Sequence, residues 1–233
     1  MPSQRSKVEI GPREARNYDL ALDLLSLGQY PRFIKRAVGK MGVKPGESVL
    51  DLGSGTGKND CFIAQRAGPQ GRVIGLDISD VMLSLAVKRC HRYANVSFRK
   101  QRIDLPLAYK EEFDKVFVSF VLHGFENDQK LEIIHNAHQA LKPGGVFCIL
   151  DYAEFDLTKE RLPFRWIFSH WECQLAVEFL ELDIKEMLRS EGFIDFEEEL
   201  FVRGRVRLLR ALKPQSAAYE RQTESQTTKL AHV

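Results

Sequence analysis

The sequence predicts an α/β protein built on one mostly parallel sheet. Short apolar segments alternate with helical segments along the chain, and a glycine-rich turn from Gly53 to Gly57 follows the first clear apolar segment. Strands that alternate with helices are typical of βαβ units, in which neighbouring strands run parallel. We therefore expect a seven-stranded, mostly parallel sheet with helices on both faces and a reversed C-terminal hairpin.

Five strands and three helices are expected in the central part of the chain. The strand segments are rich in apolar, β-branched or aromatic residues, and the helical segments are bounded by capping and breaking residues. Ser79 is a plausible N-cap, and Lys142 to Gly145 contain the proline and glycines that end a helix. The expected strands are 48–52, 72–76, 96–100, 113–122 and 146–150, and the expected helices are 59–67, 80–91 and 128–141.

The flanking regions set the expected domain boundaries. Residues 1–41 are predicted to form an N-terminal helical lid segment, in which Pro31 opens a second helix. Residues 42–212 form the main domain, which ends in a helix at 180–190 and a hairpin of strands 193–202 and 205–212. Residues 213–233 are polar and are expected to be a disordered tail.

Composition and charge exclude several classes of protein. The 233 residues carry a net charge of +2, which is too near neutral to indicate nucleic-acid binding by the chain as a whole. No apolar run approaches the ~20 residues that cross a bilayer, which leaves only peripheral membrane contact open. The N-terminus is no secretory signal, and the four cysteines (61, 90, 148 and 173) form no C-x-x-C pair. We interpret them as reduced thiols in a cytoplasmic protein.

The glycine-rich turn does not match either common phosphate-binding loop. A P-loop would need glycine at position 52 and a hydroxyl residue at 59, where this chain has Leu52 and Asn59. A dinucleotide fingerprint would need a third glycine at position 58, where Lys58 stands. A tight turn without any ligand remains an alternative on the glycines alone.

Two acidic residues strengthen the case for a ligand. Asp77 ends the second expected strand, where a carboxylate can accept hydrogen bonds from both hydroxyl groups of a ribose. Asp104 follows the third strand, and taken alone it would be read as a turn residue. Its place in series with the glycine turn and Asp77 favours a role in ligand binding.

The order of these motifs resembles the class I S-adenosylmethionine-dependent methyltransferases. "VLDLGSGTG" is similar to the family's cofactor loop, "GLDIS" to its ribose strand, "RIDLP" to its adenine-contacting turn, and "FDKVFVSFVLH" and "LKPGG" to its fourth strand and the turn before the fifth. The resemblance covers residues 49–151. It implies a Rossmann-like fold, S-adenosyl-L-methionine as cofactor, and cofactor contacts from Asp51, Gly53, Ser54, Gly55, Thr56, Gly57, Asp77, Ile78, Asp104 and Phe120.

Residues 17–33 also resemble the N-terminal segment of the ubiquinone/menaquinone-biosynthesis (UbiE-like) C-methyltransferases. The family's Tyr-Asp pair, here Tyr18 and Asp19, and the helix that follows it fold over the cofactor. Family members carry Gly-Leu-Arg-Asn after the fourth strand, where this chain has Val-Leu-His-Gly at 121–124. This departure puts a quinone substrate in doubt and leaves the cofactor expectation intact.

His123 and Tyr18 are the candidate catalytic residues. His123 follows a parallel strand at its carboxyl end, where it could take a proton from the acceptor or orient it; a purely structural hydrogen bond is an equal alternative. Tyr18 could instead be an anchoring aromatic residue, and Asp151 and Tyr152 are weaker pocket candidates. No metal is expected, because His135 and His138 have the right spacing but no carboxylate or cysteine clustered with them.

The expected function is methyl transfer to a small apolar or aromatic acceptor, a class that includes quinone precursors. N-methylation of an amine or a phospholipid headgroup is the alternative enzymatic function. A non-catalytic adenosyl-binding module is the alternative from another functional class.

Overall fold

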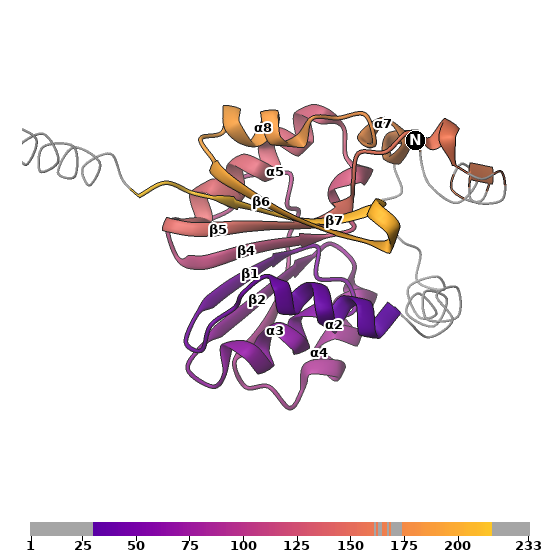
Figure 1. Cartoon of the computed structure of the whole chain (residues 1–233). Coiled ribbons are helices and arrows are strands. Elements are labelled where there is room, and N and C mark those ends of the chain that lie inside the picture. The colour runs from indigo at the N-terminus through magenta and orange to yellow at the C-terminus, as the bar shows by residue number, and fades with distance from the viewer. Residues whose placement is uncertain (1–29, 161, 163–164, 167, 169–173, 216–233) are drawn as a thin grey trace, which may run out of the picture.

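The sheet has seven strands in the order β3-β2-β1-β4-β5-β7-β6, which confirms the predicted fold class (Figure 1). The computed structural model describes residues 30–160, 162, 165–166, 168 and 174–215. The five strands from β3 to β5 are parallel to their neighbours, whereas β7 runs antiparallel to both β5 and β6. The strands are β1 (Ser48–Leu52), β2 (Arg72–Asp77), β3 (Val96–Lys100), β4 (Phe113–Ser119), β5 (Leu141–Tyr152), β6 (Ile194–Phe201) and β7 (Val206–Leu212).

Helices cover both faces of the sheet (Figure 1). One face carries α2 (Tyr30–Lys40), α3 (Lys58–Ala67) and α4 (Asp80–Cys90), and the other carries α5 (Asn127–Ala140), α7 (Gln174–Phe179) and α8 (Ile184–Ser190). The apolar faces of these helices and of the strands bury two large clusters, one on each side of the sheet. Such two-sided burial explains why the strands are apolar almost throughout.

The fourth strand is shorter than predicted, and this difference shapes the site. β4 ends at Ser119, because Phe120 adopts a positive φ of 52° that no strand can continue. The Phe120 N–H donates to the Leu150 carbonyl at 2.9 Å, and the chain then enters a short 3₁₀ turn, Leu122–Gly124. His123 is therefore carried by a turn over the end of the sheet rather than by the strand itself.

Lys213 belongs to the folded domain, so the predicted start of the tail is wrong at this residue. Its side chain is buried, and its Nζ donates to the carbonyls of Leu141 at 2.8 Å and of His138 at 3.0 Å. Its backbone also pairs with Gly144 and Gly145. Polar composition suggested a tail, but these carbonyls at the end of α5 need a donor, and the lysine provides it. Residues 216–233 lie outside the described residues.

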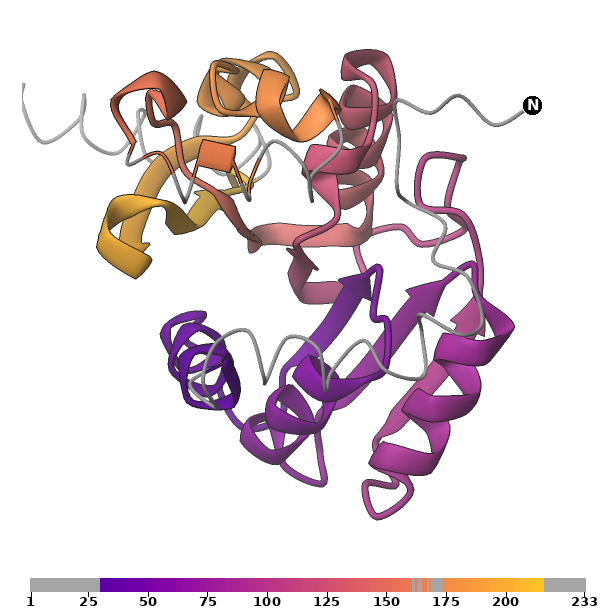
Figure 2. The ribbon, with the colours of Figure 1, turned by 90° about the vertical axis from the view of Figure 1, so that its right-hand side faces the viewer.

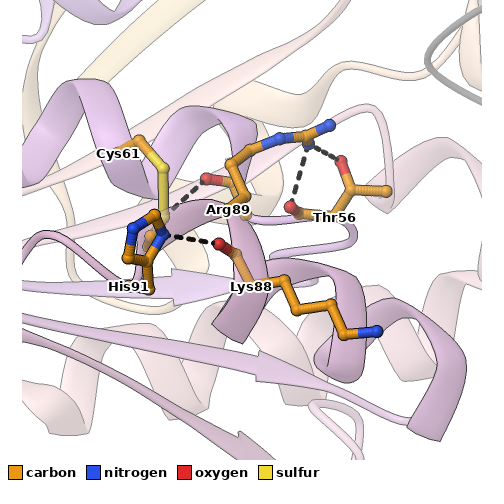
Figure 3. Close-up of a disulfide and its surroundings, with 7 residues drawn as sticks. Thr56, Cys61, Lys88, Arg89 and His91 are labelled. Atoms are coloured by element: carbon orange, nitrogen blue, oxygen red, sulfur yellow. Dashed lines mark hydrogen bonds between the residues drawn. A yellow bond between two sulfur atoms is a disulfide. The ribbon is translucent and has the colours of Figure 1, made fainter.

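Two of the cysteines form a disulfide, which contradicts the expectation of four reduced thiols. Cys61 in α3 and Cys90 at the end of α4 are joined, with their Cα atoms 5.5 Å apart (Figure 3). The sequence separation of 29 residues hides this proximity, which arises because α3 and α4 lie side by side. Cys148 is a buried free thiol whose pKa is raised by burial to about 12, and Cys173 lies outside the described residues.

Reduction of this disulfide is expected to destabilise the protein. Opening a closed loop of this length returns entropy to the unfolded chain, worth about 3–4 kcal/mol. Urea denaturation with and without dithiothreitol measures the difference, and Cys61→Ser should make the protein insensitive to the reductant. Equal midpoints for a wild-type sample in which mass spectrometry shows the disulfide would contradict this expectation.

Candidate active site

The carboxyl ends of β1, β2, β4 and β5 meet at one edge of the sheet, onto which Figure 2 looks. The glycine turn that follows β1 is docked on the end of β2. The N–H groups of Gly53 and Ser54 both donate to the Leu76 carbonyl at 2.9 Å. Ligands of open parallel sheets bind at this edge, so the turn stands where a cofactor is expected.

The three glycines of the turn have different surroundings. A Cβ atom on Gly53 would lie 2.6 Å from Val121, and one on Gly57 would lie 2.9 Å from Ala86, so both glycines allow close packing within the protein. A Cβ on Gly55 would meet nothing within 4 Å. Gly55 is thus the glycine that borders open space, and its φ of 54° also favours glycine.

Asp77, at the end of β2, holds the glycine turn through hydrogen bonds to backbone N–H groups. Its two carboxylate oxygens accept the N–H groups of Gly55 at 2.9 Å and of Ser79 at 2.8 Å. Burial raises the pKa of Asp77, and these backbone hydrogen bonds oppose that rise. This anchoring of the turn was missed by sequence reasoning, and the ribose contact of Asp77 remains a prediction. Ile78, the next residue, is half-buried at the same edge.

The far side of the turn is held by α4. The Arg89 guanidinium donates from Nη1 to the Thr56 carbonyl at 2.9 Å and also to the Thr56 hydroxyl group (Figure 3). The Ser54 hydroxyl is buried and has no hydrogen-bond partner within the described residues. Arg89 lies 33 residues from Thr56, and no local pattern indicates this contact.

Asp104 is placed near the sheet edge by an ion pair. Its carboxylate accepts from Arg102 at 3.1 and 2.6 Å and from the Gln129 amide at 3.0 Å. Asn136 of α5 holds the same turn through the Ile103 and Leu105 carbonyls, each at 2.9 Å. Asp104 is therefore rigidly positioned, and its contact with an adenine ring stays a prediction.

His123, in the turn after β4, pairs with the buried Asp151 near the end of β5, and its own side chain is partly buried. The His123 ring atom Nδ1 lies 2.7 Å from Asp151 Oδ1, and the His123 backbone N–H donates to the same carboxylate at 3.3 Å. The Tyr152 N–H donates to Asp151 Oδ1 at 2.8 Å as well. These contacts orient the imidazole, and the Tyr152 and Phe179 rings stand 5.0 and 6.4 Å from it.

Aromatic rings continue from this pair toward α2. Phe120 has ring contacts with Phe33 at 6.4 Å and with Tyr152 at 6.0 Å. The structure thus brings His123, Asp151, Tyr152 and Phe120 into one region. Tyr18, the second catalytic candidate, lies outside the described residues.

Asp51 and Asp60 lie together beneath the glycine turn. Asp51 is fully buried at the end of β1, and Asp60 is fully buried in the first turn of α3. Burial and mutual proximity raise the pKa of Asp51 well above its usual value, and burial raises that of Asp60 to about 7. Asp60 was missed in the sequence because its neighbours Lys58 and Asn59 are polar too, so nothing in the first turn of α3 marks it as buried.

Within the part of the chain that the structure describes, no group of three or more His, Cys, Asp or Glu side chains could hold a metal ion. His135 is engaged with Glu191 at 3.0 Å and with Gln139 at 2.6 Å. In the same ranges, no helix is long and apolar enough to cross a bilayer.

The fold and this edge of the sheet define a class I S-adenosylmethionine-dependent methyltransferase. The chain belongs to the methyltransferase domain family, whose model matches residues 43–192. It is 31% identical over 218 residues to a demethylmenaquinone methyltransferase of Tropheryma whipplei, covering 86% of this chain and 89% of that protein. It is 34% identical over 188 residues to the chloroplastic 2-phytyl-1,4-beta-naphthoquinone methyltransferase of Arabidopsis thaliana, covering 75% and 71%.

Solved structures show the same fold. A SAM-dependent methyltransferase from Aquifex aeolicus superposes with a TM-score of 0.64 at 18% identity, covering 88% of this chain and 100% of that one. Together these findings confirm that the protein is a methyltransferase that uses S-adenosyl-L-methionine.

The residues at the site fit this cofactor. The open space at Gly55 leaves room beside the turn, and the buried carboxyl groups of Asp51 and Asp60, with no donor of their own, suit a positively charged ligand. When bound, S-adenosylmethionine supplies an activated methyl group on a sulfonium. The glycine turn, Asp77 and Asp51 are the residues that we expect to hold it.

Asp77→Ala is expected to weaken cofactor binding about 10- to 150-fold, the equivalent of about 1.5–3 kcal/mol for hydrogen bonds to a charged group. The loss combines the freed glycine turn with the predicted ribose contact. Calorimetry with S-adenosylhomocysteine measures it. Asp77→Asn keeps one oxygen acceptor, so its affinity for S-adenosylhomocysteine should lie between that of the wild type and that of Asp77→Ala. Unchanged affinity in a folded Asp77→Ala protein would refute both roles.

Proposed function

We propose that the protein transfers the methyl group of S-adenosylmethionine to a ring carbon of a small aromatic hydroxyl compound, of the quinol class. The pair of His123 and Asp151 is the observation that carries this proposal. Carbon methylation of such a ring requires the removal of a proton, and this pair is built as a general base. The Tropheryma relative is a demethylmenaquinone methyltransferase and the Arabidopsis relative is a 2-phytyl-1,4-beta-naphthoquinone methyltransferase, and both support a quinone-related acceptor.

His123 acts through the nitrogen that does not face Asp151. With Nδ1–H donating to the carboxylate, the neutral imidazole carries its lone pair on Nε2. Nε2 takes the proton of the acceptor hydroxyl group, and the electrons released from that O–H bond move into the ring. The ring carbon beside the hydroxyl would then attack the methyl group, the methyl–sulfur bond would break, and S-adenosylhomocysteine would leave. The C–H proton of that carbon then passes to water as the oxygen regains a proton and aromaticity returns, and the proton on Nε2 is released to solvent. Asp151 is a positioning residue that also stabilises the charged imidazolium.

The neighbouring rings suit an aromatic acceptor. Tyr152 and Phe179 flank the His123 ring, and Phe120 continues the aromatic surface. Aromatic rings pack favourably in tilted or edge-to-face arrangements. Such packing would hold a quinol ring beside these side chains, with its hydroxyl group near His123. Their π faces also favour a nearby sulfonium cation.

A labelled-methyl assay tests the proposal. The protein is incubated with S-adenosylmethionine carrying a deuterated methyl group and with a reduced 1,4-naphthoquinol that lacks the ring methyl. Mass spectrometry should find the label on a ring carbon, and the oxidised quinone, which has no hydroxyl proton, should give no product. Labelling of ethanolamine or phosphoethanolamine instead would establish the N-methyltransferase alternative. If neither acceptor class gave a product, the result would favour the alternative that the protein is a non-catalytic adenosyl-binding module.

A further inference from the structure

The two carboxyl groups beneath the glycine turn have no partner that explains their burial. Within the described residues, the four carboxyl oxygens of Asp51 and Asp60 find no side-chain donor beyond the pair itself, and only the backbone N–H of Asp60 adds a further hydrogen bond, although both side chains are fully buried. An ionised carboxylate accepts hydrogen bonds and donates none, so two ionised groups in this place could not satisfy each other. Burying both as anions side by side would be very costly.

The strongest electrostatic influences on the pair come from carboxylates and not from cations. Asp77, at the end of β2, is a third carboxylate, and it acts repulsively on both members of the pair. The cations of the adjoining elements are engaged elsewhere, Lys115 of β4 with Glu47 at 3.6 Å and Arg89 of α4 with Thr56 at 2.9 Å. Lys58, which begins α3, is the cation nearest in sequence to Asp60, and it is not among the groups that act most strongly on the pair.

One proton resolves the conflict. If one group is protonated, its O–H can donate to the other, and the pair keeps a single negative charge. The pair also brackets the turn, since Asp51 lies two residues before Gly53 and Asp60 three residues after Gly57. S-adenosylmethionine carries two positive charges, on its sulfonium and its ammonium group, and one negative charge on its carboxylate, so it would bring a net positive charge to a site that contains this pair.

We propose that Asp51 and Asp60 hold one proton between them in the free protein and release it to solvent when the cationic cofactor binds. The proton is exchanged for the positive charge of the ligand, so no other reactant is needed. Asp60 is thereby a positioning residue of the cofactor site, and it acts through Asp51. The inference concerns the cofactor alone, so its failure is distinguishable from failure of the proposed acceptor.

Calorimetry across pH tests the release directly. S-adenosylmethionine affinity should rise about tenfold from pH 6 to pH 8, because below the titration of the pair each binding event must expel a proton. Titrations at pH 6.5 in two buffers of different ionisation enthalpy count that proton. 5′-Methylthioadenosine shares the adenosine and the thioether but carries no charge, and its affinity should be independent of pH. A flat profile for S-adenosylmethionine, or no proton release, overturns the proposal.

Asp60→Asn isolates the pair from other titrating groups. The new amide can donate to Asp51 and keep it ionised, so the affinity of this variant should change less than twofold between pH 6 and 8. The matched control is Asp128→Asn, an exposed aspartate in the first turn of α5, which should keep the wild-type profile. Retention of the wild-type pH dependence in Asp60→Asn would contradict the inference.

The stability of the free protein gives a second readout that needs no ligand. Because the folded-state pKa of Asp60 is raised from 3.8 to about 7, the folded protein binds more protons than the unfolded chain between these values. Its contribution to stability is full below about pH 4 and is lost as pH rises toward about 7. Urea midpoints should show this loss in the wild type and in Asp128→Asn, but not in Asp60→Asn. The same loss in Asp60→Asn would count against the shared proton.

Discussion

Replacing His123 by alanine is expected to lower the turnover of methyl transfer by about 10²–10⁴-fold, the usual contribution of a general base. Affinity for S-adenosylmethionine should stay within a few fold, because the His123 ring faces Asp151 and the aromatic rings of Tyr152 and Phe179. Single-turnover rates with the labelled methyl group and calorimetry with the cofactor measure the two quantities separately.

Two further variants separate the possible roles of this histidine. His123→Asn keeps a hydrogen-bonding side chain but cannot accept the proton, so it should be as slow as His123→Ala if the residue is a base. Near-normal turnover in the asparagine variant alone would leave orientation of the acceptor as the role. Near-normal turnover in both would make the pair with Asp151 purely structural. His91→Ala removes an exposed histidine at the end of α4 and should leave turnover unchanged.

Gly55→Val is expected to weaken cofactor binding by at least about 100-fold. The added side chain would project into the open space beside the turn, where nothing of the protein lies within 4 Å. A branched residue at a φ of 54° also strains the backbone, by about 1–3 kcal/mol. Calorimetry with S-adenosylmethionine on the folded variant measures the loss of affinity.

Gly42→Val separates strain from obstruction. Gly42 has a φ of 69° and likewise nothing within 4 Å, but it precedes β1 at the opposite edge of the sheet. It should lose a similar amount of stability in urea and bind the cofactor normally. If both valine variants bound the cofactor equally well, the cofactor would not pass beside Gly55.

Local signals in the sequence predicted the scaffold well. The bounds of β1 and β3 and the cap at Ser79 follow from residues that are neighbours in the chain, and each was predicted from apolar patterning or a hydroxyl residue before a helix. The glycine turn was found in the same way. Patterns of this kind survive folding because strand and helix preferences are decided within a few residues.

Contacts between distant segments could not be predicted. Asp151 meets His123 across 28 residues, and the end of β4 depends on a positive φ at Phe120, a residue type that seldom adopts one. Asp60 is an ionisable residue in a core position, where apolar patterning would place none. Each of these exceptions lies at the candidate site, where local preference gives way to the requirements of binding and catalysis.

The position of β7 has a consequence for how the chain is assembled during synthesis. Among the strands of residues 30–160 and 174–215, β6 pairs with β7 alone, and β7 in turn pairs with β5, so the strand made earlier is the outer one. A nascent chain that has emerged as far as β6 cannot add this strand to the sheet. β6 must wait until β7 has left the ribosome and filled the gap, when Lys213 also reaches the Leu141 carbonyl. β7 must therefore pair before β6 does, and until then the backbone N–H and C=O groups along one edge of β5 stay unpaired.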